Sequence, residues 1–145
     1  MTKDDIKEIL AKYKTVAVIG ASRDPSKDSN RVAKYLQGQG FRIIPVNPTA
    51  DEILGEKCYK SLLEIPTDIQ KIIDIVDVFR PSSDTPGIVE QAVKLKERFD
   101  RPYVVWMQIG IINEQAAEIA REAGITVVMN RCMMQEHKKF FPNSS

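Results

Sequence analysis

The chain contains 145 residues, of which 43% are hydrophobic and 28% are charged, and its formal net charge is +1. This length is typical of one domain with a substantial core, so we expect residues 1–145 to form a single domain. The near-zero charge gives no broad attraction to nucleic acid or to an anionic membrane. No apolar run approaches the roughly 20 residues that span a bilayer, and the first residues lack the pattern of a secretion signal. We therefore expect a cytoplasmic protein with no nucleic-acid or membrane partner.

Short apolar runs alternate with segments of helical periodicity along the chain. The first two runs enclose a helical segment, and this strand–helix–strand unit has the length of about 30 residues that is typical of a parallel pair. The pattern predicts strands over 15–19, 41–46, 72–79, 103–107 and 125–129. It also predicts helices over 4–14 and 130–140, and further helices that begin near residues 29, 86 and 114.

Side chains that can accept hydrogen bonds stand where three of these helices begin. Asp28 or Ser29 is placed to cap the second helix. Asp84 and Asn113 precede two later helices in the same way. Asp74 and Asp77 stand inside the third apolar run. We expect both carboxylates near the ends of this strand or at an edge of the sheet.

The order of these elements predicts the fold class. Strands that consist of continuous apolar residues are usually buried on both faces, with helices on each side. We therefore expect an α/β protein with a doubly wound, Rossmann-like sheet of about five parallel strands in a single domain. In such sheets ligands bind beyond the carboxyl ends of the strands, near the point where the strand order reverses.

The loop after the first strand contains the candidates for phosphate binding. It begins with Gly20, Ala21 and Ser22, and small residues between a buried strand and a helix leave backbone N–H groups for a diphosphate. A tight turn without a ligand is the alternative. Three cations that could neutralise phosphate charge follow in sequence, namely Arg23, Lys27 and Arg31.

The loops after the next three strands supply the other candidates. Polar and cationic side chains stand there beside apolar ones that could hold an adenine ring and a less polar tail. These residues are Val46, Asn47, Pro48, Phe79, Arg80, Met107, Gln108 and Gly110. For Phe79 and Met107, simple packing in the core is an equally good interpretation.

A nicotinamide cofactor is the main rival ligand. The glycine fingerprint G-x-G-x-x-G is absent after the first strand, and Asn47 stands where an acidic residue would hold a ribose diol. An NAD(P)-dependent oxidoreductase therefore stays open as a less favoured alternative, since an asparagine can still bond a hydroxyl.

Groups suited to catalysis are few. His137 is the only histidine, and such a residue on a late helix is more often involved in packing. Cys58 and Cys132 do not form a metal-binding spacing, and we expect two reduced thiols. No nucleophile elbow or phosphate-loop motif is present. We therefore expect binding without catalysis.

Five short motifs in this order resemble the single-domain coenzyme A-binding proteins, a family related to the N-terminal domain of the succinyl-CoA synthetase α subunit. The motifs are VIGAS at 18–22, PVNP at 45–48, VFRP at 78–81, VWMQIG at 105–110 and VMNRC at 128–132. The resemblance implies a Rossmann-type domain that binds coenzyme A (CoA) or an acyl-CoA. It places the diphosphate at 20–22 and the pantetheine arm along 107–110.

The resemblance also implies roles for the neighbouring residues. Ser29, Asn30 and Arg31 would open the helix that faces the diphosphate, while 46–48 and 79–80 would flank the adenosine. The catalytic domains of the ligases have no counterpart in this sequence, so we do not expect ligase activity. A subunit of a split acyl-CoA synthetase and a protein-interaction module are alternatives, and a homodimer is plausible. A mixed disulfide between Cys132 and the CoA thiol is a further hypothesis.

Overall fold

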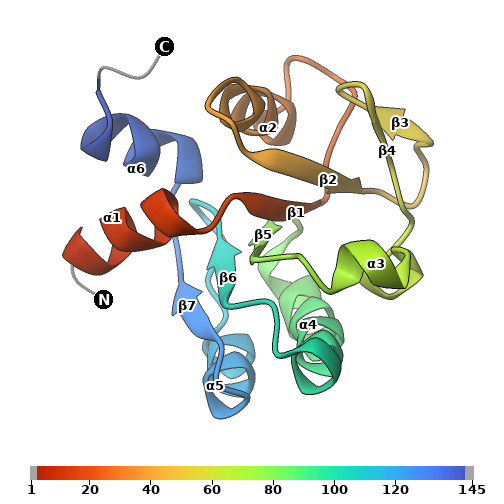
Figure 1. Cartoon of the computed structure of the whole chain (residues 1–145), viewed down its shortest axis with the longest axis vertical. Helices are drawn as coiled ribbons and strands as arrows, with labels where there is room; N and C mark the ends of the chain where they lie inside the picture. The colour runs from red at the N-terminus through yellow and green to blue at the C-terminus, as the bar shows by residue number, and fades with distance from the viewer. Residues whose placement is uncertain (1–2, 143–145) are drawn as a thin grey trace.

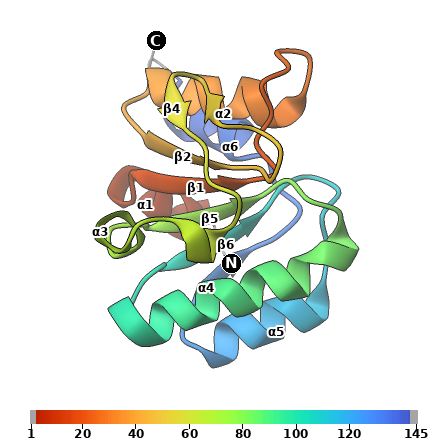
Figure 2. The ribbon, with the colours of Figure 1, turned by 90° about the vertical axis from the view of Figure 1, so that its right-hand side faces the viewer.

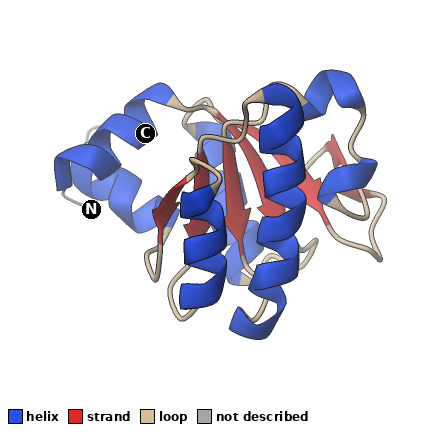
Figure 3. Cartoon of the chain, turned by 90° about the horizontal axis from the view of Figure 1, so that it is seen from below, coloured by secondary structure: helices blue, strands red, loops and turns tan. Residues whose placement is uncertain are grey.

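A five-stranded parallel sheet lies between two layers of helices (Figures 1–3). The computed structural model describes residues 3–142. The strands of this sheet are β1 (Thr15–Ile19), β2 (Arg42–Val46), β5 (Ile75–Val78), β6 (Val104–Met107) and β7 (Thr126–Val128). The helices are α1 (Lys3–Lys12), α2 (Asp28–Gly38), α3 (Thr67–Gln70), α4 (Thr85–Phe99), α5 (Glu114–Glu122) and α6 (Met133–Phe140). The predicted Rossmann-like α/β fold is confirmed.

The strand order in the sheet is β2-β1-β5-β6-β7. The chain leaves β1 toward β2 on one side and later returns to place β5 on the other side of β1. The strand order therefore reverses between β1 and β5, and the loops that follow these two strands lie side by side at the carboxyl edge. This is the position at which doubly wound sheets bind their ligands.

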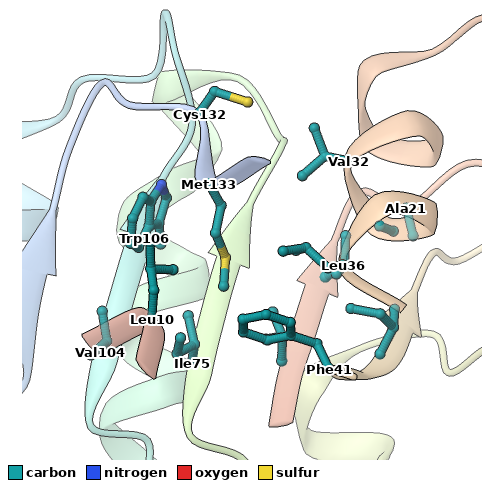
Figure 4. Close-up of a cluster of buried hydrophobic side chains, with 14 of the residues drawn as sticks. Leu10, Ala21, Val32, Leu36, Phe41, Ile75, Val104, Trp106, Cys132 and Met133 are labelled. Carbon is teal, nitrogen blue, oxygen red and sulfur yellow. The ribbon is translucent and has the colours of Figure 1, made fainter. Parts of the chain in front are cut away.

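The sheet separates two layers of core. On one face, α1, α2 and α6 cover a cluster that includes Val18 and the fully buried Trp106. On the other face, α4 and α5 cover a cluster that includes Val76 and Val105. Figure 4 shows the first cluster, with Met133 beside Trp106 and Leu36 facing them from the α2 side. Burial on both faces explains why the strands read as continuous apolar runs.

The structure differs from the sequence predictions mainly at the ends of elements. Each predicted strand except the first is shorter in the structure, because its outer residues lie outside the paired part of the sheet. A small antiparallel hairpin of β3 (Glu52–Ile53) and β4 (Glu56–Lys57) was not predicted. Among residues 3–142, no helix is long and apolar enough to cross a bilayer.

Two of the three predicted caps are wrong. Lys27 occupies the position before α2, and Asp28 and Ser29 already belong to the helix. Asp84 precedes α4, but its side chain accepts hydrogen bonds from Arg80 instead of capping the helix. Asn113 does cap α5, because its side chain accepts a hydrogen bond from the Ala116 amide at 2.9 Å.

Asp74 lies just before β5, and Asp77 lies one residue before its end, so both are near the ends of the strand as predicted, although the strand is not at an edge of the sheet. Asp77 lies in β5, the central strand, with Val18 and Trp106 as its register partners. Its side chain is fully buried, and neither carboxylate oxygen has a hydrogen-bond partner among the described residues. Burial raises the pKa of this carboxyl well above its ordinary value of 3.8. The carboxyl group is therefore held in its neutral form over a wider pH range than in the unfolded chain.

The raised pKa of Asp77 predicts a pH-dependent stability. Above about pH 4 the unfolded chain loses this proton while the folded chain keeps it, so the free energy of unfolding falls as pH rises toward the folded pKa. Asp77→Asn removes the ionisation. We expect the free energy of unfolding of the variant, relative to that of the wild type, to rise by up to about 1.4 kcal/mol per pH unit between about pH 5 and pH 7. Denaturant titration at several pH values measures this difference. A stability difference between wild type and Asp77→Asn that does not change with pH would contradict the raised pKa of Asp77.

Candidate functional site

A cavity of about 850 Å³ opens at the carboxyl ends of the strands, where the strand order reverses. Twelve of the sixteen predicted site residues line it: Gly20, Ala21, Ser22, Lys27, Ser29, Arg31, Asn47, Pro48, Phe79, Arg80, Gln108 and Gly110. Nine further residues complete the lining: Asp28, Val32, Thr49, Pro81, Ile109, Ile111, Cys132, Met134 and Gln135. The loops after β1, β2, β5 and β6 therefore meet at one site, as the topology rule predicts.

Gly20 makes the tight turn at the floor of the cavity. Its φ of 87° lies in the left-handed region that favours glycine. A Cβ atom at this position would stand 3.1 Å from Cδ of Arg80 and 3.4 Å from the backbone carbon of Phe79. The absence of a side chain therefore lets the loop after β1 contact the loop after β5.

The backbone amides of this loop differ from the prediction in one respect. The N–H groups of Gly20 and Ala21 both donate to the carbonyl of Val46, at 3.0 and 3.2 Å. The Ala21 amide is therefore engaged with β2 instead of pointing into the cavity for a diphosphate. The amides of Asp28 and Ser29 lie ahead of the hydrogen-bond ladder of α2, which begins with Asn30 and Arg31 donating to Lys27.

Two asparagine side chains hold the carbonyl groups of the same loop. Asn47 donates from Nδ2 to the carbonyl of Ala21 at 2.7 Å, and Asn30 donates from Nδ2 to the carbonyl of Ser22 at 2.8 Å. The Oδ1 atom of Asn47 also accepts from the amide and hydroxyl of Thr49 at 2.8 Å. Both ends of the Asn47 amide are therefore engaged within the protein. This use of Asn47 makes the ribose contact of a nicotinamide cofactor less favourable.

Three cations line the cavity. Lys27 and Arg31 come from the beginning of α2, whose aligned peptide dipoles favour a negative charge at that end. Arg31 contacts the carboxylate of Asp28. Arg80, after β5, donates to the carboxylate of Asp84 at 2.9 Å, and both side chains are about half exposed. The attraction within such an exposed pair is weak, so a phosphate could compete with Asp84 for Arg80.

The opposite side of the cavity is uncharged. Gln108, Ile109, Gly110 and Ile111 line it from the β6 loop, and Cys132, Met134 and Gln135 line it from the start of α6. Gln108 joins these two segments, because its Oε1 atom accepts from the Met133 amide at 3.2 Å. Figure 4 shows Cys132 on the α6 side and Val32 facing it from α2.

Four predicted site residues do not line the cavity. Val46 and Met107 are buried in the core on the α4 and α5 face of the sheet. Their side chains pack in the core, which for Met107 is the interpretation given above as the alternative to contact with a ligand. Asn30 is buried and acts on the loop through Ser22, while Arg23 is exposed outside the cavity.

His137 lies apart from the cavity and has a packing role. It is buried between helices, where its Nδ1 atom lies 2.7 Å from the hydroxyl of Tyr35. Burial, together with the charge of Lys14, lowers its pKa. Within residues 3–142 no group of acidic, cysteine and histidine side chains could hold a metal ion.

The two cysteines are free and buried, as expected, but only Cys132 lines the cavity. Burial raises the pKa of the Cys58 thiol. The mixed disulfide of Cys132 with CoA stays a prediction, because no ligand is present.

Known proteins resemble this chain over most of its length. The Bacillus subtilis protein YneT is 44% identical over 136 residues, which cover 94% of each chain. A solved structure from Pyrococcus horikoshii is 44% identical, with a TM-score of 0.87 over 97% of this chain and 92% of the other. A structure from Thermus thermophilus is 38% identical, with a TM-score of 0.86 over 97% of this chain and all of the other.

Larger enzymes contain a similar region. An ADP-forming acetate–CoA ligase from Archaeoglobus fulgidus is 30% identical over 128 residues, and the match covers 83% of this chain but 18% of the ligase. The model of the CoA-binding domain family matches residues 14–138, which include every residue that lines the cavity. The chain therefore belongs to the CoA-binding domain family that is related to the ADP-forming acetate–CoA ligases.

Proposed function

We propose that this protein binds coenzyme A in the cavity at the carboxyl ends of the strands, without catalysing a reaction. The observation that carries the proposal is the division of the cavity into two sides. All four charged lining residues, Lys27, Asp28, Arg31 and Arg80, belong to the α2 and β5 side. CoA has the same division, with phosphates at one end and an uncharged arm at the other.

The polar side of the cavity suits the nucleotide end of CoA. The start of α2 brings Lys27, Arg31 and the amide of Ser29 to the place where a diphosphate would lie. Pro48 and Phe79 offer apolar surface on either side of the loop after β1. Arg80 is placed to bind a further phosphate group once it leaves Asp84.

The uncharged side suits the pantetheine arm. The amide side chains of Gln108 and Gln135 can exchange hydrogen bonds with the two amide groups of the arm. Cys132, Met134 and Ile111 supply apolar contact beyond them. Binding without turnover agrees with the position of His137 outside the cavity.

Calorimetry with CoA, dephospho-CoA, NAD and NADP tests this proposal directly. We expect CoA to bind more tightly than either nicotinamide nucleotide. Binding of NAD with no binding of CoA would contradict the proposal and favour an oxidoreductase. Co-purification with a larger ligase-like subunit would instead favour a component of a split acyl-CoA synthetase.

The role of Arg80 predicts a selective loss of affinity. A charge-assisted hydrogen bond contributes about 1.5–3 kcal/mol, so Arg80→Ala should weaken CoA at least about tenfold. If Arg80 holds the 3′-phosphate, the variant should weaken dephospho-CoA much less. Arg23→Ala is the matched control, because Arg23 belongs to the loop after β1 but does not line the cavity. Equal losses for both ligands in Arg80→Ala would argue against this role.

A pair of glycine variants separates backbone strain from the effect on the site. Gly20 and Gly40 both have φ near 90°, but open space surrounds the Cβ position of Gly40. We expect each alanine variant to lower the free energy of unfolding by about 1–2 kcal/mol, because the left-handed conformation is strained for alanine. Gly20→Ala must also displace Arg80 and should weaken CoA several-fold, whereas Gly40→Ala should leave the affinity unchanged. Similar affinities in the two variants, measured by calorimetry, would contradict the role given to the Gly20 turn.

A further inference from the structure

The loop between β6 and α5 displays two isoleucines to solvent beside the cavity. Among the described residues, three large hydrophobic side chains are strongly exposed: Ile109 at 57%, Ile112 at 50% and Leu63 at 42%. Ile109 lines the cavity, and Ile112 lies three residues further on the same loop. Leu63 lies elsewhere, in the short 3-10 helix after β4.

The loop that carries these two isoleucines is held in place by several hydrogen bonds. The Gly110 amide donates to Oδ1 of Asn130 at 2.7 Å, and the Ile112 amide donates to Oγ of Ser82 at 3.0 Å. Within the loop, the Ile111 amide donates to the carbonyl of Gln108 at 2.9 Å. The loop is therefore tied to the segments after β7 and β5, and it presents apolar surface in a fixed position.

This apolar surface continues the uncharged side of the cavity. Ile111, Cys132 and Met134 line that side, and no charged residue between 3 and 142 lines it. A ligand whose phosphates lie at α2 would direct its thiol end toward this surface. A charged group on that end would lose hydration there without gaining an ionic partner, whereas an apolar group would cover Ile109.

We propose that the site prefers CoA thioesters with an apolar acyl chain of several carbons over free CoA, and that the chain covers Ile109 and extends toward Ile112. This inference rests on the proposed function, because it assumes that CoA lies in the cavity with its phosphates at α2. Each buried methylene group contributes through the hydrophobic effect, which corresponds to about two- to fourfold in affinity. The flexible side chain of Met134 can adapt to chains of different shape.

Calorimetry with CoA, acetyl-CoA, butyryl-CoA and hexanoyl-CoA tests the proposal in the full chain. We expect the affinity to rise along this series, with hexanoyl-CoA at least about tenfold tighter than CoA. Ile109→Ser should lower the hexanoyl-CoA affinity by a larger factor than the CoA affinity, so that the preference for the thioester shrinks. Leu63→Ser is the matched control, since it also replaces an exposed apolar side chain, and it should leave the whole series unchanged.

Several results would overturn the inference. Equal affinities for CoA and hexanoyl-CoA would contradict it while leaving CoA binding intact. An equal hexanoyl-CoA preference in wild type and Ile109→Ser would show that the acyl chain lies elsewhere. A third result would be equal affinities along the acyl series together with a dimer that sedimentation shows to dissociate in Ile109→Ser. The apolar surface around Ile109 would then be an interface between two copies of the chain. If none of the four ligands binds, the proposed function itself fails.

Discussion

The close approach of two neighbouring strand ends determines the shape of the site. The sheet reverses its strand order between β1 and β5, so the loops after these strands must share one edge. They can do so because Gly20 has no side chain and adopts a left-handed turn against the stem of Arg80. The stem of Arg80 therefore packs against the Gly20 turn, while its guanidinium donates to Asp84. A Cβ atom at position 20 would stand 3.1 Å from Cδ of Arg80 and would push this side chain away.

Polar side chains that the sequence marks as ligand contacts also hold the loops around the cavity in place. Asn30 and Asn47 hold the carbonyl groups of Ser22 and Ala21, and Gln108 holds the start of α6. These bonds fix the loop before any ligand arrives, and a site that is already ordered loses less conformational entropy on binding. The two arginines of the cavity contact carboxylates close to them in sequence. Their charges are thus partly satisfied until an anion competes.

The sequence was sufficient to predict the fold class and the edge of the sheet where the cavity lies. Apolar strand runs and alternating helices fix the topology, and the topology brings the four loops together. The sequence could not determine which residues of a loop face the cavity. Val46 and Met107 end their strands and point into the core, whereas Asn47 and Gln108, one position later, reach the cavity.

Other features escaped prediction for different physical reasons. The burial of Asp77 breaks the rule that carboxylates avoid the core, and only the strand order shows that its strand is central. Cys132, Met134 and Gln135 follow β7, so the rule that ligands lie beyond the strand ends could have found them. The exposure of Ile109 is a property of tertiary structure, because it depends on the hydrogen bonds from its loop to Asn130 and Ser82.

We propose that the two-sided cavity orients CoA, with its phosphates at α2 and its thiol at α6. A crystal structure of the complex with CoA tests this claim most directly. We expect electron density for the diphosphate beside Lys27 and Arg31, and for the sulfur beside Cys132 and Ile109. Density with the thiol end beside Asn47 and Thr49, or outside the cavity, would contradict it.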